Sequence, residues 1–386
     1  MSDRTGTTAL STGTTAVPLV AVRDDLRALE GYHSPQVDVR VRLNTNEAPT
    51  APPRAWRDAW AAEVSRLDWH RYPDRAASDL RAAIAESHGV RADQVFAANG
   101  SNEVLQTLLL AYAGHGRTVA TFEPTYQLHG HIARVTGATV AEGERAADFA
   151  LDLAEVRGVL DASHPTVTFL CSPNNPTGVV DAEAAVREVL GLVPGLLVVD
   201  EAYGQFAPWS AIELVDDARP LVVTRTFSKT WSMAAARLGY LLGPSWLVAE
   251  LEKVALPYHL DAAKQIAGRL ALRFADEMHE RVGLIVAERE RIVARLSTMA
   301  VEQWPSGANF ILFRPADRAG NDVWQGLLDR SVLVRNCSSW PGLRGCLRVT
   351  IGTSGENDAF LSALRASLHS MPTSTRIATR PDRVPS

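Results

Sequence analysis

The chain has 386 residues, of which 46% are hydrophobic and 22% are charged. This is the composition of an ordinary globular protein that can bury one large core and a smaller one. The net charge of -5 argues against a nucleic-acid-binding face, and no apolar run reaches the roughly 18 residues that a membrane-spanning helix needs.

The two ends of the chain differ in composition from the rest. Residues 1–16 are rich in Ser, Thr and Gly and lack the apolar core of a secretory signal. We therefore predict a disordered N-terminus over residues 1–21 and a disordered tail over residues 370–386.

The cysteines and histidines suggest neither a disulfide framework nor a metal site. Three cysteines are an odd and sparse set, which favours reduced thiols in a cytoplasmic protein. His129 and His131 stand two residues apart, but no pattern of Cys or carboxylates completes a metal site around them. We therefore predict no metal.

The first 94 residues predict mostly helix. Their expected elements are helices over 23–32, 54–67 and 78–87 and an alternating strand over 39–43. From residue 95 onward, apolar strands alternate with helices. The expected strands are 95–98, 118–121, 167–170, 196–199 and 221–223, with a helix over 104–113 that Ser101 or Asn102 would cap and another after Tyr126. This alternation implies an α/β fold with a mostly parallel sheet covered by helices on both faces.

The C-terminal third predicts a second lobe of α+β type. Its expected elements are helices over 250–254, 261–298 and 356–368 and strands over 309–313, 332–334 and 347–351, with an interruption of the long helix expected near Gly283. We expect a large domain over 51–255, a small domain over 256–369, and an N-terminal segment, 22–50, that completes the small domain.

Polar residues follow the apolar strands where each strand ends. Ser101 and Asn102, Asn175, Asp200 and Lys229 all stand in such positions. In a parallel sheet, ligands bind beyond the carboxyl ends of the strands. We therefore expect these side chains to gather at one edge of the sheet.

Lys229 is the most informative of these residues. Thr226 and Ser228 flank it, and Arg237 follows eight residues later. A desolvated lysine has a lowered pKa and can attack an aldehyde, while the hydroxyls and Arg237 would hold a phosphate. These features point to the lysine that binds pyridoxal phosphate. Taken alone, the stretch is equally compatible with a surface lysine at a strand end.

The other positions fit the same cofactor, and each has a simpler interpretation. Ser101 and Asn102 open a helix, which can bind phosphate or be merely capped. Asp200 can pair with a pyridine nitrogen or cap the next helix. Tyr203 and Asn175 can bond the ring hydroxyl oxygen, although the Asn175 stretch also suits a tight turn, and Tyr126 can stack on the ring or simply pack. Together with Lys229 these positions make five features, and it is improbable that all five would follow successive strands by chance.

The motifs resemble those of the class I and II aminotransferases of fold type I. The matching stretches are Ser172-Pro173-Asn174-Asn175-Pro176-Thr177-Gly178, Asp200-Glu201-Ala202-Tyr203, and Ser228-Lys229 with Arg237. Within that family the chain is most similar to the histidinol-phosphate aminotransferases. That similarity rests on Leu43-Asn44-Thr45-Asn46-Glu47, Arg71-Tyr72-Pro73-Asp74, Pro305-Ser306-Gly307-Ala308-Asn309-Phe310 and Cys346-Leu347-Arg348-Val349-Thr350. His259 departs from the pattern, because Asn is more usual there.

The resemblance implies a role for each candidate residue. Lys229 would form the Schiff base, Asp200 would pair with the pyridine nitrogen, Tyr203 and Asn175 would hold the ring oxygen, and Tyr126 would stack on the ring. The phosphate would lie among Ser101, Asn102, Thr226, Ser228 and Arg237, with Tyr72 reaching it from the other subunit of a homodimer with shared sites. Arg348 would bind the acidic end of the substrate, and Arg335 and Tyr32 a substrate phosphate; Arg335 could also be a solvated strand end.

The implied reaction is a two-stage transfer of an amino group from L-histidinol phosphate to 2-oxoglutarate. An aromatic amino acid aminotransferase is one alternative, and a decarboxylase or cyclase on the same scaffold is another. A cofactor-binding regulatory module would require a fused DNA-binding region, and no basic domain precedes Arg23.

Overall fold

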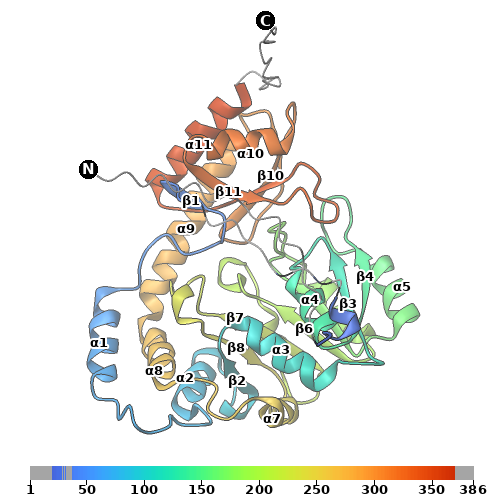
Figure 1. The fold of residues 1–386 in the computed structure, drawn as a ribbon, viewed down its shortest axis with the longest axis vertical. Helices are drawn as coiled ribbons and strands as arrows, with labels where there is room; N and C mark the ends of the chain where they lie inside the picture. The colour runs from blue at the N-terminus through green and yellow to red at the C-terminus, as the bar shows by residue number, and fades with distance from the viewer. Residues whose placement is uncertain (1–19, 28, 30, 32–36, 370–386) are drawn as a thin grey trace, which may run out of the picture. The chain divides into compact units, whose positions relative to one another are not determined.

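The computed structural model describes residues 20–27, 29, 31 and 37–369 (Figure 1). Tyr32 and most of the predicted disordered ends lie outside these residues. The chain divides into a short unit, residues 1–35, and a main unit, residues 36–386. In the short unit, the described part of the expected 23–32 helix holds a single 3₁₀ turn, η1 (Asp24–Leu26). None of its residues is buried, so no apolar packing supports a longer helix there.

The main unit contains a seven-stranded sheet with the order β2-β8-β7-β6-β5-β3-β4. Its strands are β2 (Val95–Ala98), β3 (Thr118–Glu123), β4 (Thr139–Glu144), β5 (Val167–Cys171), β6 (Leu196–Asp200), β7 (Leu221–Thr226) and β8 (Gly239–Leu242). Strands β4, β3, β5, β6 and β7 are parallel neighbours, whereas β8 runs antiparallel to both β7 and β2. The predicted α/β fold with a mostly parallel sheet is confirmed. Strand β2 therefore runs in the direction of β7, so its carboxyl end lies at the same edge.

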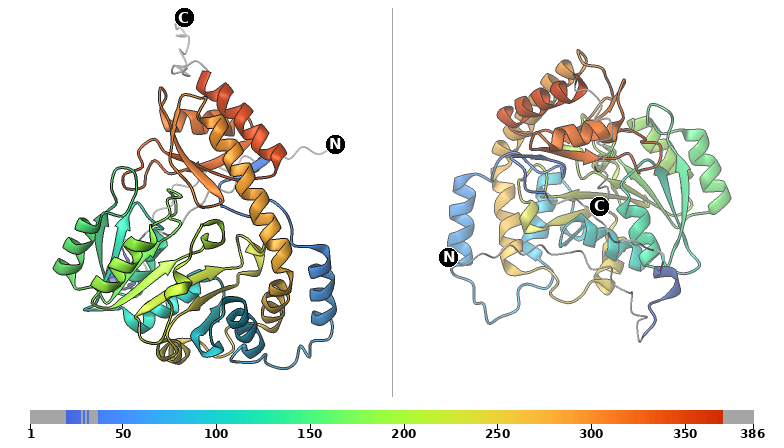
Figure 2. Two further views of the ribbon diagram at one scale, coloured as in Figure 1. Left: turned by 180° about the vertical axis from the view of Figure 1, so that it is seen from behind. Right: turned by 45° about the horizontal axis from the view of Figure 1, so that its top comes forward.

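Helices cover both faces of this sheet (Figures 1 and 2). One face packs against α3 (Ser101–Tyr112), α4 (Leu128–Val135) and α7 (Ser245–Val254), and the other against α5 (Leu153–Ser163) and α6 (Glu183–Leu192). Along β6, Val198 packs into the first layer, and Leu197 and Val199 pack into the second. The two-residue period of a strand, with both faces apolar, explains why these strands read as continuous hydrophobic runs.

A five-stranded sheet with the order β1-β11-β12-β10-β9 forms the smaller lobe. Its strands are β1 (Val41–Leu43), β9 (Val301–Gln303), β10 (Phe310–Pro315), β11 (Val332–Asn336) and β12 (Leu347–Thr350). Strand β1 comes from the N-terminal segment and pairs in parallel with β11. The lobe also contains α9 (Ala275–Leu296), α10 (Gly320–Leu328) and α11 (Ser354–His369), which share its apolar core. Figure 2 shows α9 running from the larger lobe to the smaller one.

Two local predictions are wrong. The long C-terminal helix is interrupted by a 3₁₀ turn, η6 (Leu272–Phe274), which follows α8 (Ala262–Ala271), and Gly283 lies within α9. A glycine in a helix costs about 1 kcal/mol and does not by itself end it. The N-cap of α3 is Gly100, with φ of +84°, and Ser101 is already the first helical residue.

Sequence inspection also missed several elements, among them β4, β8, β9, α5, α6 and α10. Strand β4 is an edge strand with exposed polar residues, which gives it no apolar signal. Helices α1 (Arg54–Val64) and α2 (Ser78–His88) match the expected ranges closely and pack against α8.

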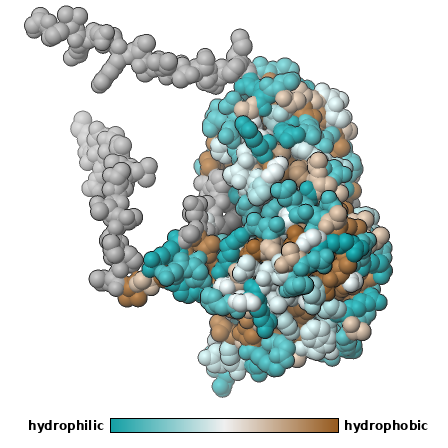
Figure 3. All heavy atoms as spheres, turned by 90° about the vertical axis from the view of Figure 1, so that its right-hand side faces the viewer, coloured by the Kyte–Doolittle hydropathy of each residue, from teal (hydrophilic) through white to brown (hydrophobic). Residues whose placement is uncertain are grey.

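Two further features, the polarity of the surface and the character of the helices, bear on the class of protein. Polar side chains dominate the face in Figure 3, with apolar residues scattered among them. None of the helices in the described part of the chain combines the length and apolar character that crossing a bilayer demands.

Candidate active site

Polar groups that follow the carboxyl ends of β2 and β7 gather around Arg237. The Thr226 and Ser228 hydroxyl oxygens lie 3.0 Å apart, and Nη1 of Arg237 donates to Oγ of Ser228 across 3.4 Å. A Cβ at Gly100 would lie only 2.9 Å from Nη2 of Arg237, so glycine is what lets the guanidinium reach the N-terminus of α3. Glycine at position 239 lets strand β8 approach the start of α3, since a Cβ there would lie 2.3 Å from the backbone nitrogen of Ser101. A guanidinium, two hydroxyls and a helix N-terminus together suit a phosphate group.

Lys229 directly follows Ser228 in the chain and is half-buried just beyond the end of β7. Its Nζ donates to the backbone oxygen of Thr45 across 3.1 Å and lies 5.7 Å from the centre of the Tyr203 ring. Burial, followed by the positive charge of Arg348, lowers the pKa of Lys229 to about 7. A large fraction of this amine is therefore neutral near physiological pH, as a nucleophile toward an aldehyde must be.

Asp200 ends β6, and several donors hold its carboxylate. Oδ2 lies 2.9 Å from Nε2 of His129, while Oδ1 accepts from the Thr224 hydroxyl at 3.1 Å and from the backbone N–H of Ala202 at 3.1 Å. The residue is 1% exposed, so these donors replace the water it has lost. Asp200 does not cap a long helix, since the turn that follows is η3 (Gly204–Phe206).

Tyr203 follows Asp200 and is buried at the junction of the two lobes. Its hydroxyl accepts from Nδ2 of Asn46 at 2.9 Å, and its ring meets the Phe310 ring edge-on with 5.0 Å between centroids. Burial raises the pKa of Tyr203 to about 12. The phenol therefore keeps its proton at physiological pH and can donate it in a hydrogen bond.

Asn175 and Arg348 join the two sheets. Nη1 of Arg348 donates to Oδ1 of Asn175, and Nη2 donates to the backbone oxygen of Asn44 at 2.9 Å. The guanidinium carbon of Arg348 lies 5.1 Å from the centre of the Phe310 ring. Both side chains belong to residues that are 5% exposed, so Arg348 is oriented before any substrate arrives.

Arg335 lies opposite Arg348 on the neighbouring strand. The two residues are register partners of the antiparallel pair β11–β12. Partners of this kind point to the same face of a sheet. Arg335 is 9% exposed and lies over the Trp340 ring, 5.7 Å from its centre.

The structure brings some of the remaining predicted site residues together and leaves others apart. The Tyr126 hydroxyl donates to Oδ1 of Asn102 at 3.2 Å, which places both of them beside the first turn of α3. Tyr72 is 80% exposed and stacks on Tyr258, with 4.5 Å between ring centroids. Tyr32 lies outside the described residues.

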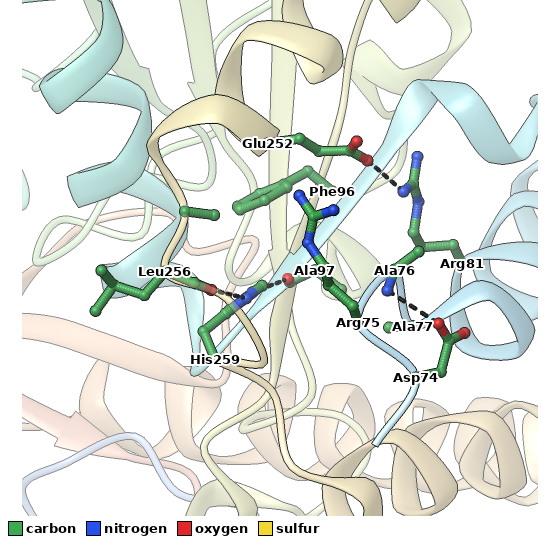
Figure 4. Close-up of a pocket in the computed structure, with 11 residues that line it drawn as sticks. Asp74, Arg75, Ala76, Ala77, Arg81, Phe96, Ala97, Glu252, Leu256 and His259 are labelled. Carbon is green, nitrogen blue, oxygen red and sulfur yellow. Dashed lines mark hydrogen bonds and ion pairs between the residues drawn. The ribbon is translucent and has the colours of Figure 1, made fainter. Parts of the chain in front are cut away.

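A pocket of about 180 Å³ lies near the loop that carries Tyr72, and none of the predicted site residues lines it (Figure 4). His259 stands at its edge, with Nε2 3.0 Å from the backbone oxygen of Ala97 and Nδ1 3.2 Å from that of Leu256. Its ring also stacks on Phe96. His259 thus holds in place the loop whose Tyr258 stacks on Tyr72.

Sequence reasoning assigned no site role to four residues that hold this arrangement. They are Thr45, Asn46, His129 and Thr224. The sequence analysis considers His129 only for a metal site, which it does not predict. Within the described residues no group of three or more His, Cys, Asp or Glu side chains could hold an ion. The sequence analysis uses the stretch around Asn46 only as evidence of family resemblance. The local sequence of this stretch does not indicate which residues Asn46 contacts.

Known proteins match this chain over most of its length. The model of the family "Aminotransferase class I and II" matches residues 39–364. Histidinol-phosphate aminotransferase of Frankia casuarinae is 45% identical over 90% of each chain, and that of Mycobacterium marinum is 44% identical over 89% of this chain and 91% of its own.

Solved structures share the fold. Histidinol-phosphate aminotransferase from Sinorhizobium meliloti, in complex with pyridoxal-5'-phosphate, superposes with a TM-score of 0.79 at 23% identity, covering 86% of this chain and 91% of that one. The enzyme from Clostridium acetobutylicum also gives 0.79, at 20% identity over 85% and 99%. With its motifs, sheet order and extended sequence identity in agreement, the chain belongs to the class I and II aminotransferases.

Proposed function

We propose that this protein is a pyridoxal phosphate-dependent aminotransferase that moves the amino group of L-histidinol phosphate to 2-oxoglutarate, giving imidazole acetol phosphate and L-glutamate in histidine biosynthesis. The names and the 43–45% identity of the curated relatives support this donor. The observation that carries the proposal is the pairing of Arg335 with Arg348 on adjacent strands. Two guanidinium groups on one sheet face suit substrates that bear acidic groups.

The residues present fit the cofactor. The cluster formed by Gly100, Ser101, Thr226, Ser228 and Arg237 offers the hydrogen-bond donors that a phosphate needs. The firmly held carboxylate of Asp200 suits a protonated pyridine nitrogen, and the buried phenol of Tyr203 suits an anionic ring oxygen. The amide of Asn175, which contacts Arg348, would be a second partner of that oxygen. Tyr126 would flank the ring.

Each residue would then perform a defined task. When bound, pyridoxal phosphate supplies an aldehyde that takes up the amino group and a ring that withdraws electrons. Lys229 would hold the cofactor through its Nζ, and the same amine, once free, would accept the proton from the substrate α-carbon. Arg348 fixes the acidic end of the substrate, and Asn44 and Asn175 keep the guanidinium in place.

The assembly is also part of the proposal. The exposure of Tyr72 and its stacking on Tyr258 support a homodimer in which each Tyr72 reaches the phosphate pocket of the partner subunit. The three cysteines are all free and buried, which supports a cytoplasmic location. The proposed domains are 51–255 and, for the small one, 22–50 with 256–369; β1 joins the small sheet, whereas α8 packs against α1 and α2 of the large domain.

The test is a comparison of amino donors with purified protein and 2-oxoglutarate. We expect L-histidinol phosphate to give a far higher kcat/KM than phenylalanine, and glutamate to form in equal amount to the keto product. Preference for phenylalanine would identify an aromatic aminotransferase. Carbon dioxide release, or turnover without a keto acid, would identify a decarboxylase or cyclase. Lys229→Ala should abolish turnover and the visible absorption of the bound cofactor.

A further inference from the structure

Three consecutive residues, Asn44, Thr45 and Asn46, each hold a different site residue. The backbone oxygen of Asn44 accepts from Arg348, and that of Thr45 accepts from Lys229. Asn46 instead uses its side chain, whose Nδ2 donates to the Tyr203 hydroxyl. Asn46 is 1% exposed and has φ of +55°, a left-handed conformation that asparagine tolerates better than most residues.

The hydrogen bonds around Asn46 determine which way its side-chain amide is turned. The backbone N–H of Asn46 donates to Oγ1 of Thr350 at 3.0 Å, so the single proton of the Thr350 hydroxyl is free to donate to Oδ1 of Asn46, also at 3.0 Å. This contact places the amide oxygen toward Thr350 and the amide N–H₂ toward Tyr203. The phenol oxygen of Tyr203 must then accept, and its own proton is left for another acceptor.

We infer that Asn46 is a positioning residue that acts through Tyr203, keeping the phenol proton directed at the ring oxygen of the bound cofactor. The inference rests on the proposed function and deepens it. A relay from Thr350 through Asn46 to Tyr203 links β12 of the small sheet to the cofactor. A hydrogen bond from Tyr203 stabilises the anionic form of that ring oxygen, and so sets the pH at which the bound cofactor ionises.

Asn46→Asp is the sharpest test, because a carboxylate has the same shape but can only accept. The Tyr203 hydroxyl would donate its proton to the carboxylate at position 46 and would no longer donate it to the ring oxygen of the cofactor. The readout is the pH midpoint of the visible absorption of the holoenzyme without substrate. We expect the midpoint to rise by about one pH unit, as befits the loss of a hydrogen bond to a charged group.

Two comparisons test whether the midpoint shift of Asn46→Asp comes from the hydrogen bond to Tyr203. The alternatives are the added negative charge and a loosening of residues 44–46. Lys229, Arg348 and Asp200, the charged groups that act on Tyr203 or lie near it, are the same in every variant. In a Tyr203→Phe background, Asn46→Asp should move the midpoint clearly less, because the phenol is gone. Asn309 donates to the backbone oxygen of Asn46, at 3.2 Å, and not to its side chain, so Asn309→Ala should leave the midpoint where it is.

The outcomes are distinct. If Asn46→Asp fails to fold, Thr350→Val removes the hydroxyl that orients the amide and should raise the midpoint by a smaller amount. An unchanged midpoint in the folded variants would overturn the inference, as would equal shifts in the wild-type and the Tyr203→Phe backgrounds. The absence of any visible cofactor band in the wild-type protein would instead overturn the proposed function.

Discussion

Nε2 of His129 lies 2.9 Å from Oδ2 of Asp200, and both side chains are almost completely shielded from solvent. The imidazole stacks on Phe169, with 4.4 Å between ring centroids, and meets Tyr126 edge-on at 5.3 Å. A residue of α4 thus holds a carboxylate that ends β6. Because the imidazole can turn little between these rings, it holds Asp200 in one orientation.

His129→Phe should weaken cofactor binding while preserving the fold. Phenylalanine keeps the stacking on Phe169 but removes one donor from Asp200, so the carboxylate is held less firmly and pairs less well with the ring nitrogen. The loss of one hydrogen bond to a charged group corresponds to about a tenfold or greater increase in the Kd of pyridoxal phosphate. Absorbance titration of the cofactor-free protein measures it, with Phe169→Leu as the control that keeps the donor. Unchanged affinity in His129→Phe would contradict the assigned role.

Arg335 and Arg348 should respond differently to substitution. Arg348→Lys loses the two-pronged contact with Asn175 and Asn44, so kcat/KM should fall about a hundredfold or more for both substrates. Arg335→Ala should raise the KM of L-histidinol phosphate much more than that of 2-oxoglutarate, because only the donor carries a phosphate. Steady-state kinetics with each substrate varied separately decides this. Equal effects on both substrates would remove Arg335 from phosphate recognition.

Lys229 should destabilise the cofactor-free protein in a pH-dependent way. Its pKa is about 7 in the folded chain, and that of an unfolded lysine is about 10.4, so between these values the unfolded state binds more protons. Stability from this group therefore rises with pH through that window, and the full penalty is present below pH 7. Lys229→Met should raise the Tm at about pH 6, and the gain should shrink as the pH approaches about 10. A gain that is constant across the window would show that the pKa is not lowered.

Tyr72 should act in the site of the other subunit. Tyr72→Ala and Lys229→Ala dimers should each be poorly active. After the two variants are mixed and exchange subunits, half of the dimers would contain one intact site, giving about a quarter of wild-type activity. Activity assays before and after exchange test this, with size-exclusion chromatography to confirm dimers. No recovery after exchange would place Tyr72 outside a shared site.

The fold class could be predicted from the sequence, and the candidate site residues could be proposed from it, because both depend on local patterns. Strands β6 and β7 begin with continuous apolar runs, Leu196–Val199 and Leu221–Val223, and polar residues follow those runs directly. Once strands are parallel, geometry brings their ends to one edge. Antiparallel β8 and polar edge strand β4 escaped notice because neither carries that pattern.

Sequence alone determined which residues are candidates for the chemistry: Lys229, Asp200, Tyr203 and Arg348 are marked by residue type and by place in a motif. Tertiary structure alone decided what orients them. Asn46 meets Tyr203 across 157 positions of the chain and Thr350 across 304, and His129 meets Asp200 across 71. Hydrogen bonds over such separations leave no local pattern, because they form only when tertiary packing brings distant elements together.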